Sequence, residues 1–299
     1  MVARLQQAMV ALVLCCVATW LAWMWPRSPL LALAGAVARV GGHGLILAIE
    51  FIILRRVNRG DSVPQATAMQ LVRAWWAETC IAFQVFCWRQ PFRSRQIADQ
   101  IAPSSFVPGR CGVVLVHGFV CNRGFWTPWL LRLRRAGHPF IAVNLEPVFG
   151  SIDDYAATLD AAVRKITAVS GRPPVLVCHS MGGLAARAWL RTADDTQVAH
   201  VITIGSPHGG TWLGRFSRAA NGRQMHEGSG WLGALGELET AERRGRFTCW
   251  YSNSDNVVFP ASTATLAGAD NRLVTGVPHV ALAFHGEVMR ASLAKISAL

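Results

Sequence analysis

The fold is indicated by one short segment, Val175-Leu176-Val177-Cys178-His179-Ser180-Met181-Gly182-Gly183-Leu184. An apolar run, typical of a strand buried on both faces, leads directly into a serine and then into residues that open a helix. This order predicts that Ser180 lies in a sharp strand-to-helix turn with its hydroxyl exposed. Such a turn needs small flanking residues, because the strained backbone brings its neighbours together. The alternative is an ordinary Ser-Met-Gly-Gly turn that opens a helix without special function.

The rest of the chain from residue 110 onward alternates short β-rich runs with helical stretches, which is the pattern of an α/β domain. The nearly all-apolar runs suit a mostly parallel sheet covered by helices on both faces. We expect strands at 112–116, 140–144, 175–178, 200–204, 247–251 and 272–275. We expect helices at 151–169, 181–191 and 285–297.

The serine segment resembles the G-x-S-x-G nucleophile elbow of the α/β-hydrolase family, with one departure. Cys178 stands where the family usually has glycine, while Gly182 fills the second small position. Together with the motifs described next, the resemblance covers about residues 110–299 and implies an α/β-hydrolase fold. It also implies that Ser180 is the nucleophile.

Upstream, an apolar run leads into His117-Gly118-Phe119, which looks like the oxyanion loop of the same family. The resemblance implies that the backbone N–H groups of Phe119 and Met181 form the oxyanion hole. Two fixed donors of this kind stabilise the negative oxygen that develops when an acyl carbonyl is attacked.

A serine nucleophile needs a base, and the base needs a carboxylate that fixes its tautomer. The family order is serine, acid, histidine. Residues 252–258 resemble the acid-bearing loop of many bacterial lipases, and residues 276–280 match the histidine loop in position. The resemblance therefore implies Asp255 as the acid and His279 as the base. His285 is kept as the fallback base, and His117, His179 and His208 are interpreted as structural. Asp194 and Asp195 follow a helix and are interpreted as solvated, and Asp270 lies before a strand rather than after one.

The loop 205–211 is close to one that recurs in lipases and in inositol-deacylase-like hydrolases, which places the chain near that subgroup by resemblance. Residues 211–240 follow it, where lipases commonly place a cap. Two interpretations of this stretch remain equal: a mobile apolar lid over an acyl pocket, or an immobile helical insert that completes the core.

The amino-terminal third looks suited to lipid. The chain is 52% hydrophobic and only 15% charged, with mean hydropathy +0.30. Met9 to Trp25 carries no charge, and a second apolar run extends from Leu30 to Leu54. We predict a membrane anchor at 1–60, in the form of a helical hairpin with two transmembrane helices. An amphipathic helix and linker follow at 61–109, and the hydrolase domain occupies 110–299. A cleaved signal peptide ending near Ala32-Leu33-Ala34 is the rival to the first transmembrane helix.

Arg39, His43 and Glu50 lie near one face of the second apolar helix. They form either a polar relay inside the bilayer or a seam in which Arg39 and Glu50 pair against the first helix or a neighbouring subunit. Arginines 55, 56 and 59 follow this helix, and only Arg27 lies between the two runs. The positive-inside rule then places both outer ends, and the hydrolase domain, on the cytoplasmic face of a bacterial inner membrane.

Residues 65–90 predict an amphipathic helix that ends at Pro91. Its apolar side, with residues 69, 72, 76, 80, 83 and 86, rests either on the lipid headgroups or against the hydrolase domain.

The net charge of +12 suits an anionic surface, either nucleic acid or lipid headgroups. No basic face with interleaved aromatics supports nucleic-acid binding, and neither a C-x-x-C pair nor a Gly-rich phosphate loop indicates a metal or cofactor. The expected function is a membrane-anchored serine hydrolase that needs no cofactor and cleaves carboxylic esters with an apolar acyl chain. The alternatives are an acyltransferase, thioesterase or amidase with the same triad, or a non-catalytic membrane scaffold. The oligomeric state stays open.

Overall fold

The computed structural model describes residues 1–299 and contains one six-stranded sheet with the order β2-β1-β3-β4-β5-β6. Every pair of neighbouring strands is parallel. The strands are β1 (Val113–Val116), β2 (Phe140–Ala142), β3 (Val175–His179), β4 (His200–Ile204), β5 (Phe247–Tyr251) and β6 (Asp270–Leu273). The predicted α/β fold is confirmed. The last strand begins earlier than expected, because Asp270 pairs with Thr248 inside the ladder.

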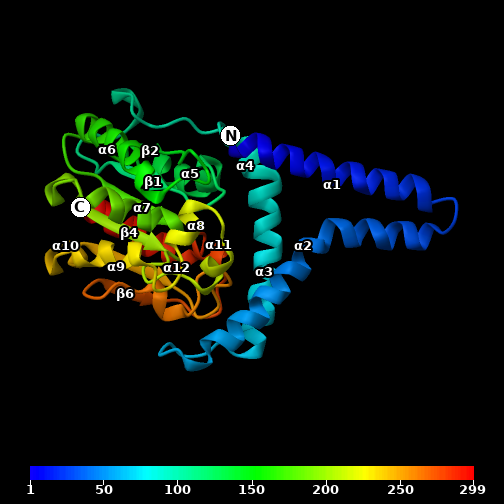
Figure 1. Cartoon of the computed structure of the whole chain (residues 1–299). Helices are drawn as coiled ribbons and strands as arrows, with labels where there is room; N and C mark the ends of the chain where they lie inside the picture. The colour runs from blue at the N-terminus through cyan, green and yellow to red at the C-terminus, as the bar shows by residue number, and fades with distance from the viewer.

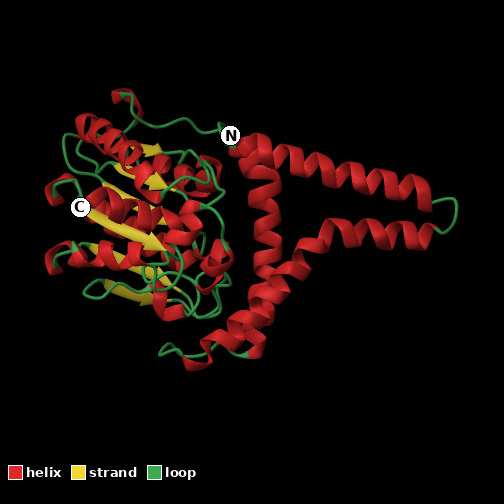
Figure 2. Cartoon of the chain, in the orientation of Figure 1, coloured by secondary structure: helices red, strands yellow, loops and turns green.

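Helices cover both faces of the sheet (Figures 1 and 2). One apolar core lies under α6 (Ala156–Ser170) and α7 (Met181–Leu190), and it takes Val114 and Val116 from β1. The other core lies under α5 (Thr127–Arg135) and α12 (Gly286–Ala298), and it takes Val113 and Leu115. This alternation along a fully buried strand follows from the two-residue side-chain period. Shorter helices complete the domain: α8 (Ala220–Gln224), α9 (Gly230–Glu237), α10 (Ala241–Gly245) and α11 (His279–Leu282).

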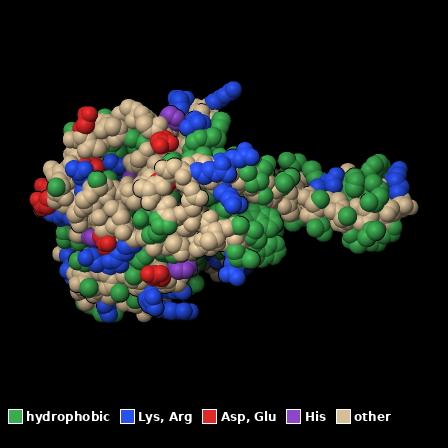
Figure 3. Space-filling view, turned by 90° about the horizontal axis from the view of Figure 1, so that it is seen from below, with side chains coloured by type: hydrophobic (Ala, Val, Ile, Leu, Met, Phe, Trp, Pro, Cys, Tyr) green, Lys and Arg blue, Asp and Glu red, His purple; other side chains and the backbone are tan.

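The amino-terminal helices form a separate arm. Helices α1 (Val2–Met24) and α2 (Pro29–Val57) make a hairpin that projects from the domain, and α3 (Ala68–Gln84) runs between the hairpin and the domain (Figure 1). The helices Val2–Met24 and Pro29–Gly60 are long and apolar enough to cross a membrane, judged by length and composition. In the space-filling view, apolar side chains cover much of the projecting hairpin (Figure 3).

Helix α3 continues past the point where the sequence predicts its end. A π-helical turn (Val85–Arg89) joins it to α4 (Gln90–Arg93), so Pro91 lies within the helical run. The prediction that Pro91 ends the helix is wrong. Proline fits here because it follows the π-helical turn, where the regular i→i−4 pattern of hydrogen bonds is interrupted.

The apolar side of α3 points away from the hydrolase domain. Met69, Val72, Trp76 and Phe83 are exposed, whereas the buried residues of α3 are Leu71, Ala74 and Glu78. The helix therefore buries a carboxylate together with Leu71 and Ala74, and it leaves four large apolar side chains on the exterior. An ordinary surface helix would expose polar side chains there.

The polar residues of α2 have separate contacts. The Arg39 guanidinium lies 4.1 Å from the ring centre of Trp20 on α1, which fits the seam between the two helices. Glu50 does not pair with Arg39. Its carboxylate accepts a hydrogen bond from Asn256 of the hydrolase domain, at 2.8 Å, so the expectation that Glu50 pairs against the first helix is wrong.

Candidate active site

Ser180 occupies the predicted sharp turn between β3 and α7. Its backbone has φ 55° and ψ −129°, a conformation that residues other than glycine rarely adopt. Its N–H donates to the carbonyl of Ile204 at 2.9 Å, which ties the turn to β4. A Cβ at Gly182 would lie 2.4 Å from the Val116 carbonyl oxygen, so the turn requires glycine there. Cys178 is fully buried in the sheet, and this small side chain fits where the family usually has glycine.

The structure brings Asp255 and His279 together at the carboxyl edge of the sheet. Asp255 follows β5, and its Oδ2 lies 2.9 Å from Nδ1 of His279, the first residue of α11. The other carboxylate oxygen accepts N–H groups from Val257 at 2.9 Å and Val258 at 2.8 Å. Both members of the pair are buried. Burial lowers the pKa of His279, but the attraction of Asp255, Glu78 and Glu50 raises it more, so its pKa lies above the usual value.

His179 links the serine turn to the candidate base. Its Nε2 lies 3.3 Å from the carbonyl oxygen of His279, and the two ring centres are 4.6 Å apart. Its other face stacks on Phe125 at 4.4 Å. Burial holds the pKa of His179 well below the usual value, so the ring is neutral and its Nε2–H donates to that carbonyl. The residue beside Ser180 therefore positions the backbone of His279.

The two N–H groups expected to form the oxyanion hole lie in different local settings. The N–H of Phe119 donates to no protein acceptor, and Met181 is the first residue of α7, where N–H groups have no intrahelical partner. Val120, directly after Phe119, has φ 53°, so this loop is strained like the serine turn. Phe119 packs edge-on against the exposed Phe149 at 5.7 Å, which gives the loop an apolar surface.

Two of the other histidines, His117 and His208, have structural partners. Nδ1 of His117 donates to the Gly118 carbonyl at 2.9 Å, and its Nε2 accepts the N–H of Leu145 at 3.1 Å. Burial lowers the pKa of His117 to about 4, so it is neutral. His208 contacts Thr203 at 2.9 Å, and His285 is the N-cap residue of α12.

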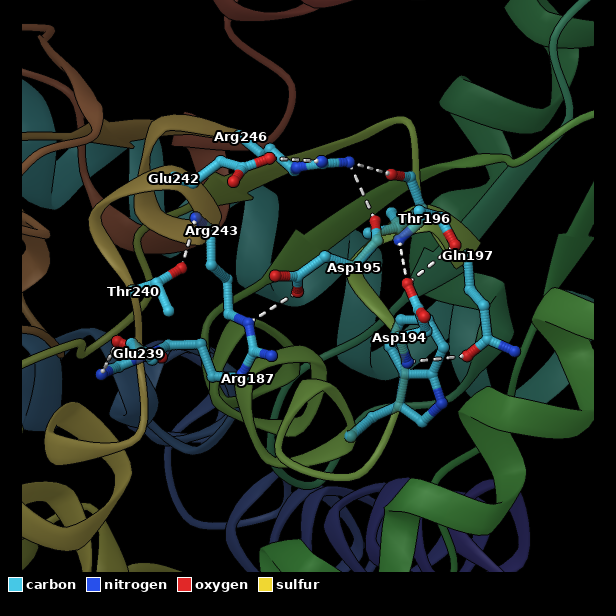
Figure 4. Close-up of polar contacts among 12 residues, drawn as sticks. Arg187, Asp194, Asp195, Thr196, Gln197, Glu239, Thr240, Glu242, Arg243 and Arg246 are labelled. Atoms are coloured by element: carbon cyan, nitrogen blue, oxygen red, sulfur yellow. Dashed lines mark hydrogen bonds and ion pairs between the residues drawn. The ribbon is translucent and has the colours of Figure 1, made fainter.

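The remaining candidate carboxylates also have partners of their own. Asp270 pairs with Arg272 at 2.7 Å. Asp195 pairs with Arg243 at 2.6 Å, and Asp194 caps a short 3-10 turn, within the polar network of Figure 4. The same network contains the buried pair of Arg187 and Glu239. No group of three or more His, Cys, Asp or Glu side chains is arranged to hold a metal ion.

The stretch 211–240 contributes to the apolar core under α6 and α7. Leu235 is fully buried, and Met225 and Leu232 belong to the same apolar cluster as α7. The indole N–H of Trp231 donates to Asp153 at 2.8 Å. This packing favours the immobile insert over the mobile lid.

Two carboxylates near the base were not recognised as site residues from the sequence. Glu78 accepts N–H groups from the residues that follow His279, and Glu50 bonds Asn256, beside Asp255. The available signal is their position: Glu78 is the only carboxylate of α3, and Glu50 interrupts the apolar run of α2.

A positive-φ serine after a central parallel strand, with an Asp–His pair at the same edge, defines the α/β-hydrolase class. A model described as the alpha/beta hydrolase family matches residues 113–292, and the chain belongs to this family. Among solved structures, the mature form of the Bacillus licheniformis lipase BlEst2 is 18% identical, with a TM-score of 0.57 over 64% of this chain and 94% of that one. Its propeptide form is 20% identical, with a TM-score of 0.55 over 64% of this chain and 51% of that one. These likenesses show the fold. No curated protein matches the sequence.

Proposed function

We propose that this protein is a membrane-anchored serine hydrolase that cleaves carboxylic esters with an apolar acyl chain. The observation that carries the proposal is the Asp255–His279 pair, 2.9 Å apart, at the same edge of the sheet as a serine held at positive φ. A lipase among the structural relatives supports an ester substrate.

In the proposed mechanism, Ser180 Oγ attacks the ester carbonyl while Nε2 of His279 takes its proton. Asp255 holds Nδ1–H and stabilises the imidazolium. The N–H groups of Phe119 and Met181 bind the carbonyl oxygen as it becomes negative. The C–O bond then breaks, and the leaving alcohol takes the proton from His279. Water, deprotonated by His279, attacks the acyl-enzyme, which releases the acid and restores Ser180. No cofactor is required.

The arm supports the membrane part of the proposal. Large apolar side chains along α1 and α2 are exposed, including Leu12, Leu14, Val37 and Ile46. The apolar side of α3 is exposed next to them, so lipid would cover both surfaces. We propose that the two helices span the bilayer as a hairpin.

The contacts of the hairpin favour two retained helices over a cleaved signal peptide. The amino group of Met1 pairs with Glu146 at 2.7 Å, so the start of α1 rests on the hydrolase domain. The Ala32 carbonyl, at the rival cleavage site, accepts the Trp20 indole N–H at 3.1 Å. Near its other end the hairpin meets the same domain through Glu50 and Asn256. The exposed arginines 55, 56 and 59 at this end favour the cytoplasmic face of a bacterial inner membrane.

Labelling of the full-length protein with a fluorophosphonate tests the proposal. Wild type should label and hydrolyse p-nitrophenyl butyrate, whereas Ser180→Ala should do neither and should keep its thermal unfolding temperature. Hydrolysis should decrease as the pH falls through the raised pKa of His279, because only the neutral imidazole accepts the proton. Unlabelled wild type would support the non-catalytic scaffold. Labelled wild type that prefers a thioester, an amide or an acyl acceptor would be a thioesterase, an amidase or an acyltransferase, respectively.

A further inference from the structure

Each helix of the arm contacts a different loop of the candidate active site. On α1, the Gln6 amide donates to the Val120 carbonyl at 3.3 Å, in the oxyanion loop. On α2, Glu50 reaches the loop of Asp255. On α3, Glu78 reaches the loop of His279. Figure 1 shows α3 lying along the side of the domain from which the hairpin projects.

We propose that Glu50 and Glu78 are positioning residues for His279, so that the esterase site is complete only while α2 and α3 are docked on the domain. The inference rests on the proposed function, in which His279 is the base.

Glu78 fixes the start of α11. One carboxylate oxygen, Oε1, accepts the N–H of Val280 at 2.9 Å, and Oε2 lies 3.2 Å from the same nitrogen and 3.3 Å from that of Ala281. These are the two residues directly after His279. A carboxylate on the first N–H groups of a helix satisfies donors that otherwise have no partner. Glu78 therefore sets the direction in which α11 leaves His279.

Glu50 acts through one intermediate. Its Oε2 accepts the side-chain N–H of Asn256 at 2.8 Å, and the Asn256 Oδ1 in turn accepts the backbone N–H of His279 at 3.3 Å. Asn256 directly follows Asp255. The chain of hydrogen bonds from α2 thus joins the acid loop to the base. Three successive N–H groups, those of residues 279, 280 and 281, are held directly or through Asn256 by the two carboxylates.

Neither carboxylate has a cationic partner that would offset the cost of its burial. Glu78 is 2% exposed, and neither Glu50 nor Glu78 takes part in any salt bridge. Burying a charge without a cationic partner is unfavourable, and the group adjusts by binding a proton more tightly. Burial raises the pKa of Glu78 to about 7, against the opposing effects of its backbone donors and of His279. We therefore assign Glu50 and Glu78 a role in holding the loops of Asp255 and His279 that they contact.

The charged and titratable groups around His279 come from four elements. Asp255 lies on the loop after β5, Glu50 on α2, Glu78 on α3, and His179, which is neutral, at the end of β3. The attraction of Glu78 raises the pKa of His279. Glu78 carries this charge above its own pKa of about 7, and removing it there lowers the pKa of His279, so the base stays neutral at lower pH. The acid limb is the fall in kcat/KM at low pH as His279 gains a proton. If Glu78 acted only in packing, its replacement would not move this limb.

The test uses full-length protein in detergent micelles and p-nitrophenyl butyrate. We expect Glu78→Gln to lower kcat by about tenfold to a hundredfold, because a small displacement of a catalytic group has effects of this order. KM should stay within about twofold, and the acid limb of kcat/KM should move to lower pH. The control is Glu287→Gln, which removes a carboxylate from the exposed first turn of α12. It should leave kcat, KM and the acid limb unchanged.

A second pair of variants separates geometry from charge and applies even where Glu78→Gln fails to fold. Glu50→Gln keeps an oxygen that accepts the Asn256 N–H and should retain most of kcat. Glu50→Ala removes that acceptor and should lower kcat by about tenfold. Equal kcat values for Glu50→Ala, Glu50→Gln and wild type would overturn the role of Glu50.

Wild-type kcat and an unmoved acid limb in Glu78→Gln would overturn the role of Glu78. The role of Glu78 would also be overturned if the loss of kcat equalled the fraction of the variant that is unfolded at the assay temperature and the acid limb did not move. Fluorophosphonate labelling keeps these outcomes apart from failure of the proposed function. Wild type that does not label would remove the serine mechanism itself, whereas labelled wild type with unaffected variants would remove only the positioning role.

Discussion

Replacing Gly205 with alanine should separate Asp255 from His279 without touching either residue. Gly205 follows β4 and has φ 57°. A Cβ built there would lie 2.9 Å from Oδ2 of Asp255 and 3.2 Å from Nδ1 of His279, directly against their hydrogen bond. The first distance is 0.5 Å inside the 3.4 Å at which ordinary van der Waals contact begins.

The new methyl group cannot be accommodated by a simple shift of the carboxylate. The opposite oxygen of Asp255 is held by the N–H groups of Val257 and Val258, so moving away from Gly205 breaks one set of hydrogen bonds or the other. The left-handed backbone adds about 1–2 kcal/mol for any residue with a Cβ. Since the pair orients the base, we expect kcat to fall by about 10²- to 10⁴-fold.

A matched variant separates this effect from backbone strain. Gly268 also has positive φ, 84°, and its nearest neighbour would be the Cβ of Arg244 at an ordinary 3.7 Å. Both Gly205→Ala and Gly268→Ala should lower the unfolding temperature by a few degrees, at about 2–4 °C for each kcal/mol in a domain of this size. Only Gly205→Ala should lose hydrolysis of p-nitrophenyl butyrate. Equal kcat values for the two variants would refute the reasoning.

Two further outcomes follow from the partners of other charged residues. In a steady-state assay, Asp255→Asn should lower kcat strongly. Asp270→Asn breaks only a partly exposed pair with Arg272 and should leave kcat within about twofold. A larger loss in Asp270→Asn than in Asp255→Asn would show that the acid is misassigned. Glu239→Ala should lower the free energy of unfolding by about 3–5 kcal/mol, because it leaves Arg187 charged and only 3% exposed. Chemical denaturation measures this loss, and a change below about 1 kcal/mol would mean that water or another group replaces the carboxylate.

The sheet was predictable because its signal is local. Each buried strand is a short apolar run, and all of the expected runs became strands, with small differences at their ends. Strand β6 starts two residues before the predicted position. It is an edge strand whose first residues are exposed and polar, so no apolar signal marks its start at Asp270.

The contact between Asp255 and His279 was predictable through the order of motifs, since parallel strands place their following loops at one edge. The roles of Glu50 and Glu78 could not be found in this way. They depend on how α2 and α3 dock on loops about 200 residues away in the chain, and no local pattern encodes that docking. Similarly, the apolar pattern of α3 predicted a helix with one apolar side but not that this side faces outward.

The length of helix α2 makes the position of Glu50, and so of the candidate active site, dependent on bilayer thickness. It is continuous over 29 residues, about 43 Å at 1.5 Å per residue, which exceeds the roughly 30 Å of a hydrocarbon core. Glu50 follows Pro29 by 21 residues, so it lies about 32 Å along the axis, near the level at which such a core would end. A spanning helix adapts to a thinner bilayer by tilting. Helix α2 is continuous from Pro29 to Glu50, although it bends on the way (Figure 1). The tilt would therefore displace Glu50 from Asn256, and reconstituted enzyme would lose turnover as lipid chain length departs from the value that matches the hairpin.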